Sequence, residues 1–268
     1  MRSARLRLLA ATALTASACA TAPPPTPEEA ALIEEMSNRS IAPATAEARA
    51  AIGEADLLSQ VTFWGEQYDN NPADRDAALH FARTSRAVGQ PARAVAVANN
   101  ALALRPNDPG LLSELGAALI MDGRAPAAGA PLARAVDIDP MDARARGLYG
   151  AALDHAGEHD AARDQYEAAL AIQGDNPAVL SNYAMSFTLS GDPGSAEQLL
   201  RRALVLPGAD GRVRQNLALT LALQGKFDEA EQLAQQDLAR DVAEANIAYV
   251  RSLIERPRQW DGLRGTLE

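Results

Sequence analysis

The sequence predicts an all-α fold, in which pairs of antiparallel helices repeat along the chain and stack into an α-solenoid. Glycine recurs every 34 residues, and alanine recurs with the same period five positions after each glycine. Aromatic residues make up 4% of the chain, and no segments alternate as consecutive strands would. Both columns are unbroken over five copies: Gly89, Gly123, Gly157, Gly191 and Gly225, then Ala94, Ala128, Ala162, Ala196 and Ala230.

Each column has a physical reason in a helix pair. Glycine adopts left-handed backbone angles at little cost, so it suits the turn where the first helix ends. Alanine lets the second helix cross the first closely, and neighbouring copies then stack to bury their apolar faces. A spacing of 34 residues is the period of the tetratricopeptide repeat (TPR). Residues 75–242 are therefore predicted to form five TPR repeats, which start at Arg75, Pro109, Ala143, Pro177 and Gly211.

Residues 1–18 have the pattern of a secretory signal peptide, with three arginines before a short apolar stretch. Small residues lead up to Cys19, the single cysteine of the chain. This arrangement resembles a bacterial lipobox, although Ala16 stands where a leucine is usual. The resemblance implies cleavage before Cys19 and lipidation of that residue, and with Ala20 next it implies the outer membrane. Ordinary cleavage after a small residue, without lipidation, is the alternative.

Residues 19–43 are predicted to form a tether between the lipidated cysteine and the repeats. The first part, residues 20–27 (ATAPPPTP), is rich in proline and lacks core-forming side chains. Pro27 followed by two glutamates indicates a helix start, so a short amphipathic helix is expected from Glu28 to Met36.

Residues 44–74 are predicted to form a degenerate TPR-like unit ahead of the five clear repeats. A helix is expected over 45–58, and residues 59–70 fall in phase with the second helix of a repeat. Phe63 and Trp64 of this unit are expected to cover the open end of the stack, as an atypical terminal repeat does.

The second helix of the second repeat is irregular. Gly129 and Pro131 lie within the expected second helix of the second repeat, residues 125–138. A proline inside a helix removes a hydrogen bond, so this helix should have a frayed or kinked start. Residues 243–268 are expected to supply a capping helix, from Ala243 to Glu255, and a tail.

Charge and reactive side chains argue against nucleic-acid binding, metal binding and catalysis. The net charge of −10 opposes binding to nucleic acid or to anionic lipid. His155 and His159 have the four-residue spacing of a helical metal pair, but Gly157 marks a turn between them and no third ligand is evident. Asp154 beside His155 lacks any accompanying nucleophile motif. A solvated turn is the plainer interpretation, and the sequence predicts no enzyme, metal or cofactor.

The predicted binding site is a groove lined by the first helix of each repeat, whose inward-facing places are a property of the TPR fold. Asn182 and Asn216 occupy the same place in successive repeats, and a side-chain amide can pair with a peptide backbone unit. Methionine nearby suits an adaptable apolar partner. The alternative is that both amides are simply solvated. The expected peptide-binding residues are Ser181, Asn182, Met185, Leu189, Gln215, Asn216 and Leu223.

Three stretches stand out: Phe63-Trp64-Gly65, Ser181-Asn182-Tyr183 and Arg214 to Gln224 (RQNLALTLALQ). With them, nearly the whole mature chain resembles the TadD-like TPR lipoproteins of the tight-adherence (Flp, or Tad) pilus assembly system. The resemblance implies a pilotin, an outer-membrane lipoprotein on the periplasmic face that helps the pilus secretin to reach the membrane and multimerise. A periplasmic TPR scaffold of another cell-envelope machine is the alternative.

Overall fold

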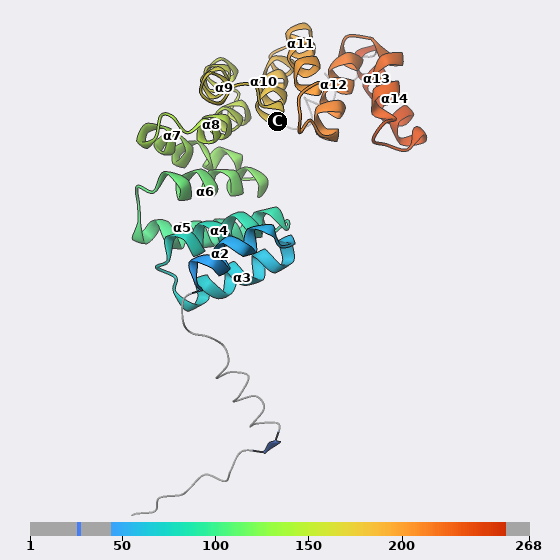
Figure 1. The fold of residues 1–268 in the computed structure, drawn as a ribbon. Coiled ribbons are helices and arrows are strands. Elements are labelled where there is room, and N and C mark those ends of the chain that lie inside the picture. The colour runs from blue at the N-terminus through green and yellow to red at the C-terminus, as the bar shows by residue number, and fades with distance from the viewer. Residues whose placement is uncertain (1–25, 28–43, 256–268) are drawn as a thin grey trace, which may run out of the picture. The chain divides into compact units, whose positions relative to one another are not determined.

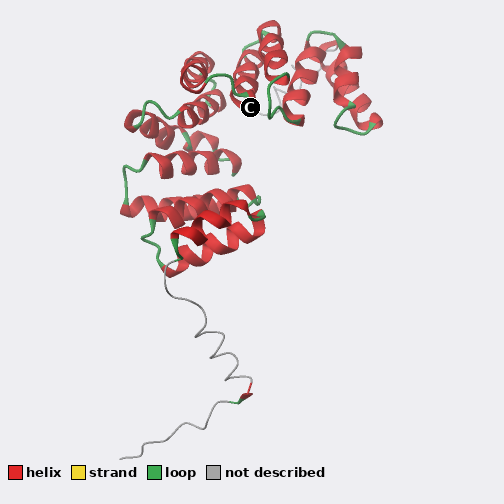
Figure 2. Ribbon diagram, viewed as in Figure 1, coloured by secondary structure: helices red, strands yellow, loops and turns green. Residues whose placement is uncertain are grey.

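The computed structural model describes residues 26–27 and 44–255. The chain divides into two compact units, Met1–Pro43 and Ala44–Glu268. All regular elements of the described residues are helices (Figures 1 and 2), which confirms the predicted all-α repeat fold. The expected signal peptide, the Cys19 anchor, the tether helix and the C-terminal tail lie outside the described residues.

The helices of the second unit run in pairs, and each first helix begins where the period predicts. These first helices are α4 (Arg75–Ala87), α6 (Pro109–Met121), α8 (Ala143–His155), α10 (Pro177–Leu189) and α12 (Gly211–Leu223). The second helices are α5 (Pro91–Leu104), α7 (Gly129–Ile138), α9 (His159–Gln173), α11 (Pro193–Leu204) and α13 (Phe227–Ala234). Each helix packs against the helix before it and the helix after it, as Figure 1 shows.

The glycines of the repeat lie in turns and the alanines lie where helices cross, as the period predicts. Every turn glycine of the column has a left-handed backbone, with φ between 74° and 87°. All five column alanines are fully buried, because the second helix of each pair crosses the first at that point. A larger side chain at any of these places would separate the two helices.

A further column, one residue before each first helix, caps that helix. Each side-chain oxygen accepts a hydrogen bond from a backbone N–H of the first turn, at 2.9 to 3.2 Å. Those N–H groups have no partner within the helix, so each cap contributes about 1 kcal/mol. The capping residues are Asp74, Asp108, Asp142, Asn176 and Asp210.

The second helix of the second repeat has the disturbed start that its sequence predicts. A 3₁₀ turn, Ala125–Ala127, precedes α7, which begins only at Gly129. Pro131 therefore lies in the first turn of α7, where its missing N–H has no helical acceptor to lose.

The degenerate TPR-like unit, residues 44–74, contains more and shorter helices than expected. In place of one helix over 45–58 there are α2 (Ala46–Ala51) and a 3₁₀ turn, followed by α3 (Leu57–Asn70). Asp56 starts α3, because its side chain accepts the N–H groups of Leu58 and Ser59, both at 3.0 Å.

Trp64 is buried between helices instead of standing over an open end. Its ring stacks on His80 of α4, with ring centroids 4.4 Å apart, and Phe63 meets it edge-on. The Arg49 guanidinium of α2 lies over the same ring, 5.7 Å from its centroid. The degenerate TPR-like unit therefore covers the tryptophan with a cation–π contact.

The capping helix, α14 (Arg240–Glu255), starts three residues before the expected Ala243. The second helix of the fifth repeat ends early, at Ala234, and turns join the two. Ile247 and Ala243 of α14 are buried against the last repeat. Among the described residues, no helix combines the length and apolar character needed to cross a membrane.

Candidate functional site

The first helices form one continuous surface. Contacts join α4 to α6, α6 to α8, α8 to α10, α10 to α12 and α12 to α14. The places expected to face a partner lie on these helices, so residues about 34 positions apart become spatial neighbours.

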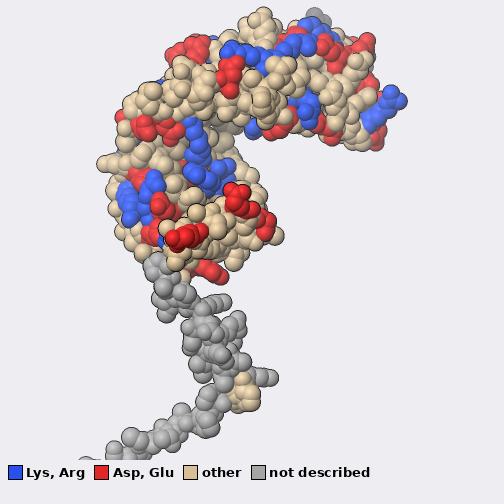
Figure 3. Space-filling view, viewed as in Figure 1, with Lys and Arg blue, Asp and Glu red and all other residues tan. Residues whose placement is uncertain are grey.

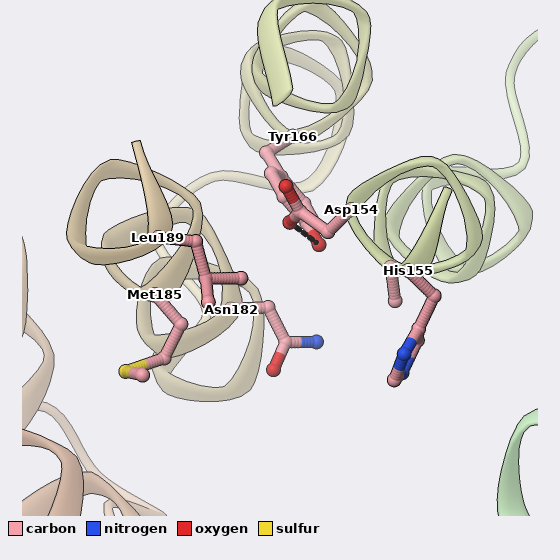
Figure 4. A pocket seen from close by; sticks show the side chains of 7 residues that line it. Asp154, His155, Tyr166, Asn182, Met185 and Leu189 are labelled. Carbon is pink, nitrogen blue, oxygen red and sulfur yellow. Dashed lines mark hydrogen bonds between the residues drawn. The ribbon is translucent and has the colours of Figure 1, made fainter. Parts of the chain in front are cut away.

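A pocket of about 160 Å³ opens on this surface where α8, α9 and α10 meet. Figure 4 shows His155 of α8 and Asn182 of α10 extending into the same open space, with Met185 next to Asn182. Three of the expected binding residues, Asn182, Met185 and Leu189, thus lie together. The pocket is lined by Ala151, Asp154 and His155 of α8, Tyr166 of α9, and Asn182, Met185 and Leu189 of α10.

The wall of the pocket is held by Asp154. Its carboxylate accepts a hydrogen bond from the Tyr166 hydroxyl at 2.9 Å and another from the Ser186 hydroxyl at 2.7 Å. His159 Nδ1 lies 2.8 Å from the same carboxylate. Asp154, expected in a solvated turn, instead links the two helices of the third repeat to the first helix of the fourth.

The tyrosines of this region stay protonated and act as donors. Burial is the main cause that raises the pKa of the Tyr166 hydroxyl, and the negative charge of the neighbouring Asp154 raises it further. Burial and the hydrogen bond to Glu167 raise the pKa of Tyr183 to about 12. Both hydroxyls are therefore neutral around pH 7 and fix the carboxylates that face them.

The two asparagines expected to act alike have different environments. Asn216 Nδ2 donates to the Ser181 hydroxyl at 2.9 Å, so this amide links α12 to α10. Ser181 is fully buried, which corrects the expectation that it faces a peptide. It turns into the interface because α10 and α12 pack side by side. The side-chain amide of Asn182, by contrast, makes no hydrogen bond to any described residue.

The remaining expected residues lie away from the first pocket. Gln215 contributes to a second, largely apolar pocket of about 390 Å³ between the last repeat and α14. Leu223, at the end of α12, is 38% exposed. The expected site is therefore divided between two places along the first helices.

The histidine pair is also divided. His155 is the last residue of α8 and His159 the first of α9, so the two rings do not share one helix face. Within the described part of the chain, no three His, Cys, Asp or Glu side chains gather as a metal site requires.

A tetratricopeptide-repeat model matches residues 55–209, more than half of the chain, and a second such model matches residues 213–245. The chain belongs to the tetratricopeptide-repeat family. TPR proteins are scaffolds whose stacked repeats bind other proteins on an extended surface.

Solved structures share the fold of this TPR protein. A thermophilic TPR protein of Thermus thermophilus is 23% identical, with a TM-score of 0.54 over 65% of this chain and 94% of that one. PilF of Pseudomonas aeruginosa is 17% identical, with a TM-score of 0.52 over 70% of this chain and 92% of that one. At such identities the likeness shows the fold alone. Curated protein sequences gave no match.

Proposed function

We propose that this TPR protein binds a segment of a partner protein in the pocket between α8 and α10. One observation carries the proposal: the Asn182 amide lines the pocket without a hydrogen bond to any described residue. A primary amide offers both donors and an acceptor, which match the C=O and N–H of a peptide unit. Met185 and Leu189 beside it supply apolar surface for the side chains of that segment.

The partner that we propose is the secretin of a tight-adherence (Flp) pilus, and the role is that of a pilotin. The support is the resemblance to TadD-like lipoproteins, whose sharpest stretches include Ser181-Asn182-Tyr183 and therefore the pocket amide itself. The likeness to PilF adds a shared fold and no partner.

We further propose an anchor at the periplasmic face of the outer membrane. Its support is the lipobox-like sequence before Cys19 and the Pro-rich segment after it. Several acyl chains on one cysteine hold a protein at a membrane far more firmly than one chain does. The TPR surface would then stand within reach of a secretin subunit that arrives in the periplasm.

Secretin assembly in cells tests this function. In a strain that lacks the chain, re-expressed wild-type protein should restore secretin multimers at the outer membrane, and Asn182→Ala should restore far fewer. Capture of a different envelope machine in place of the secretin would overturn the pilus assignment but not the proposal that the pocket binds a partner. Full multimer formation with the folded Asn182→Ala variant would overturn the pocket.

A further inference from the structure

A fully buried glutamate, Glu114 of α6, lies among three arginines of neighbouring repeats. Arg86 Nε donates to Oε1 at 2.5 Å, and Arg144 Nη2 donates to Oε2 at 2.7 Å. Arg83 Nε lies 3.6 Å from Oε2. Because Arg83 and Arg86 belong to α4 and Arg144 belongs to α8, the cluster spans the first three repeats. No part of the Glu114 side chain is exposed to solvent.

The cluster carries more positive charge than the glutamate needs. Three guanidinium groups against one carboxylate leave a net charge of +2, in a chain whose own net charge is −10. Figure 3 shows basic side chains gathered over α6 and next to α8. The Arg83 and Arg144 side chains are 44% and 40% exposed, so their outer faces remain open to solvent.

Most N–H groups of the three guanidinium groups also have no acceptor among the described residues. A guanidinium has five N–H groups, and Glu114 takes one from Arg86 and one from Arg144. The guanidinium group of Arg83 makes no hydrogen bond to any described residue. Glu114 thus holds the guanidinium groups of Arg86 and Arg144 in position, while the side chains of Arg83 and Arg144 stay partly open to solvent.

We propose that Arg83, Arg86 and Arg144 form a second recognition site, which binds the carboxylate side chains of an acidic segment in a partner protein. The planar guanidinium fork matches a carboxylate with two parallel hydrogen bonds. A long polyanion such as nucleic acid is disfavoured, because the acidic remainder of the surface repels it. This site uses other residues than the Asn182 pocket and does not depend on the partner being a secretin.

Binding of a short synthetic peptide of alternating Glu and Ala to the purified full-length chain tests the proposal by calorimetry. The matched peptide has Gln in place of Glu. We expect the Glu peptide to bind with an affinity that falls as salt is raised, and the Gln peptide not to bind. Equal binding of both peptides, or no binding of the Glu peptide at low salt, would overturn the proposal.

Two substitutions locate the site. Arg83→Gln removes the arginine that is most exposed and farthest from Glu114, so it should weaken the peptide roughly tenfold with little change in melting temperature. Arg144→Gln should weaken it similarly. Arg212→Gln is the matched control, because Arg212 occupies in the fifth repeat the place that Arg144 has in the third. An equal loss in the control would show diffuse charge attraction in place of a site.

Histidine signals in an NMR titration report the two sites separately, since the chain has three histidines. Burial and the nearby Arg83 lower the pKa of His80, so a carboxylate bound at Arg83 should raise it. His155 lines the Asn182 pocket, so its ring signals should keep their chemical shifts when the peptide is added. An unchanged His80 with a shifted His155 would place the peptide in the other pocket. Dimers that Arg83→Gln abolishes would assign the cluster to self-association instead.

Discussion

Replacement of Gly150 on α8 tests the packing beneath the pocket. A Cβ atom at this position would lie 2.7 Å from Cε1 of Tyr166 and 2.9 Å from its Cδ1 and Cζ atoms. The ring cannot simply move away, because Tyr166 is 1% exposed and its hydroxyl donates to Asp154 at 2.9 Å. Gly150→Ala must therefore push α8 from α9, and the shift also breaks that hydrogen bond.

The expected loss follows from these two effects. Overpacking costs about 1–3 kcal/mol, and losing a hydrogen bond to a carboxylate costs about 1.5–3 kcal/mol. Alanine restores about 1 kcal/mol through its better helix propensity. The free energy of unfolding should fall by about 3 kcal/mol, which corresponds to about 6–12 °C in melting temperature for a chain of this size.

Thermal and urea unfolding followed by circular dichroism measures this loss. Gly147→Ala is the matched control on the same helix, because its Cβ atom would lie 3.4 Å from Val179 Cγ2, an ordinary contact. The control should be as stable as the wild type or slightly more stable. A Gly150→Ala variant as stable as this control would refute the reasoning that the Tyr166 ring is held in place.

Three further predictions concern other parts of the chain. Cys19→Ala should abolish lipid labelling and release the protein from the outer-membrane fraction; a variant that stays there without a partner would contradict the anchor. Pro131→Ala should lower the stability by about 0.4–1 kcal/mol, because the proline already fits the first turn of α7 and restrains the unfolded chain; a higher melting temperature would show that the helix extends instead. The ion pair with Lys226, at 2.6 Å, and hydrogen bonds from Gln224 and Arg201 lower the pKa of Glu197 from 4.5 to about 2. The stability that Glu197 adds is therefore present above pH 4.5 and lost as the pH falls toward 2, so the difference between wild type and Glu197→Gln in urea unfolding should shrink over that range. A difference that is constant with pH would contradict the ion pair.

The repeat fold could be predicted because its signals are local and periodic. A turn glycine and a crossing alanine each serve one helix pair, so the sequence period maps directly onto the structure. The capping column was available by the same reasoning, since Asp74, Asp108 and Asp142 have the repeat spacing. The residue before each first helix is Asp or Asn, which are preferred helix-capping residues.

The candidate site could be predicted only partly from the sequence, because the inward-facing places do not reveal which side chains pair with one another. Asn182 and Asn216 have equivalent places, yet only the second meets a serine of the preceding repeat. Asp154 was expected in a solvated turn, and it is instead held by donors from two neighbouring helices. Such contacts depend on the packing of whole helices, which no local pattern encodes.

The most direct test of the central claim is the capture of the secretin from solubilised membranes by the wild type, Asn182→Ala and Asn216→Ala. Losing the free amide leaves a partner's backbone group unpaired, at about 1–3 kcal/mol, so Asn182→Ala should bind roughly tenfold more weakly or worse at unchanged melting temperature. Asn216→Ala should retain the secretin and lose stability, because its amide bonds to Ser181. Equal capture by all three proteins would contradict the claim that the pocket between α8 and α10 binds the partner.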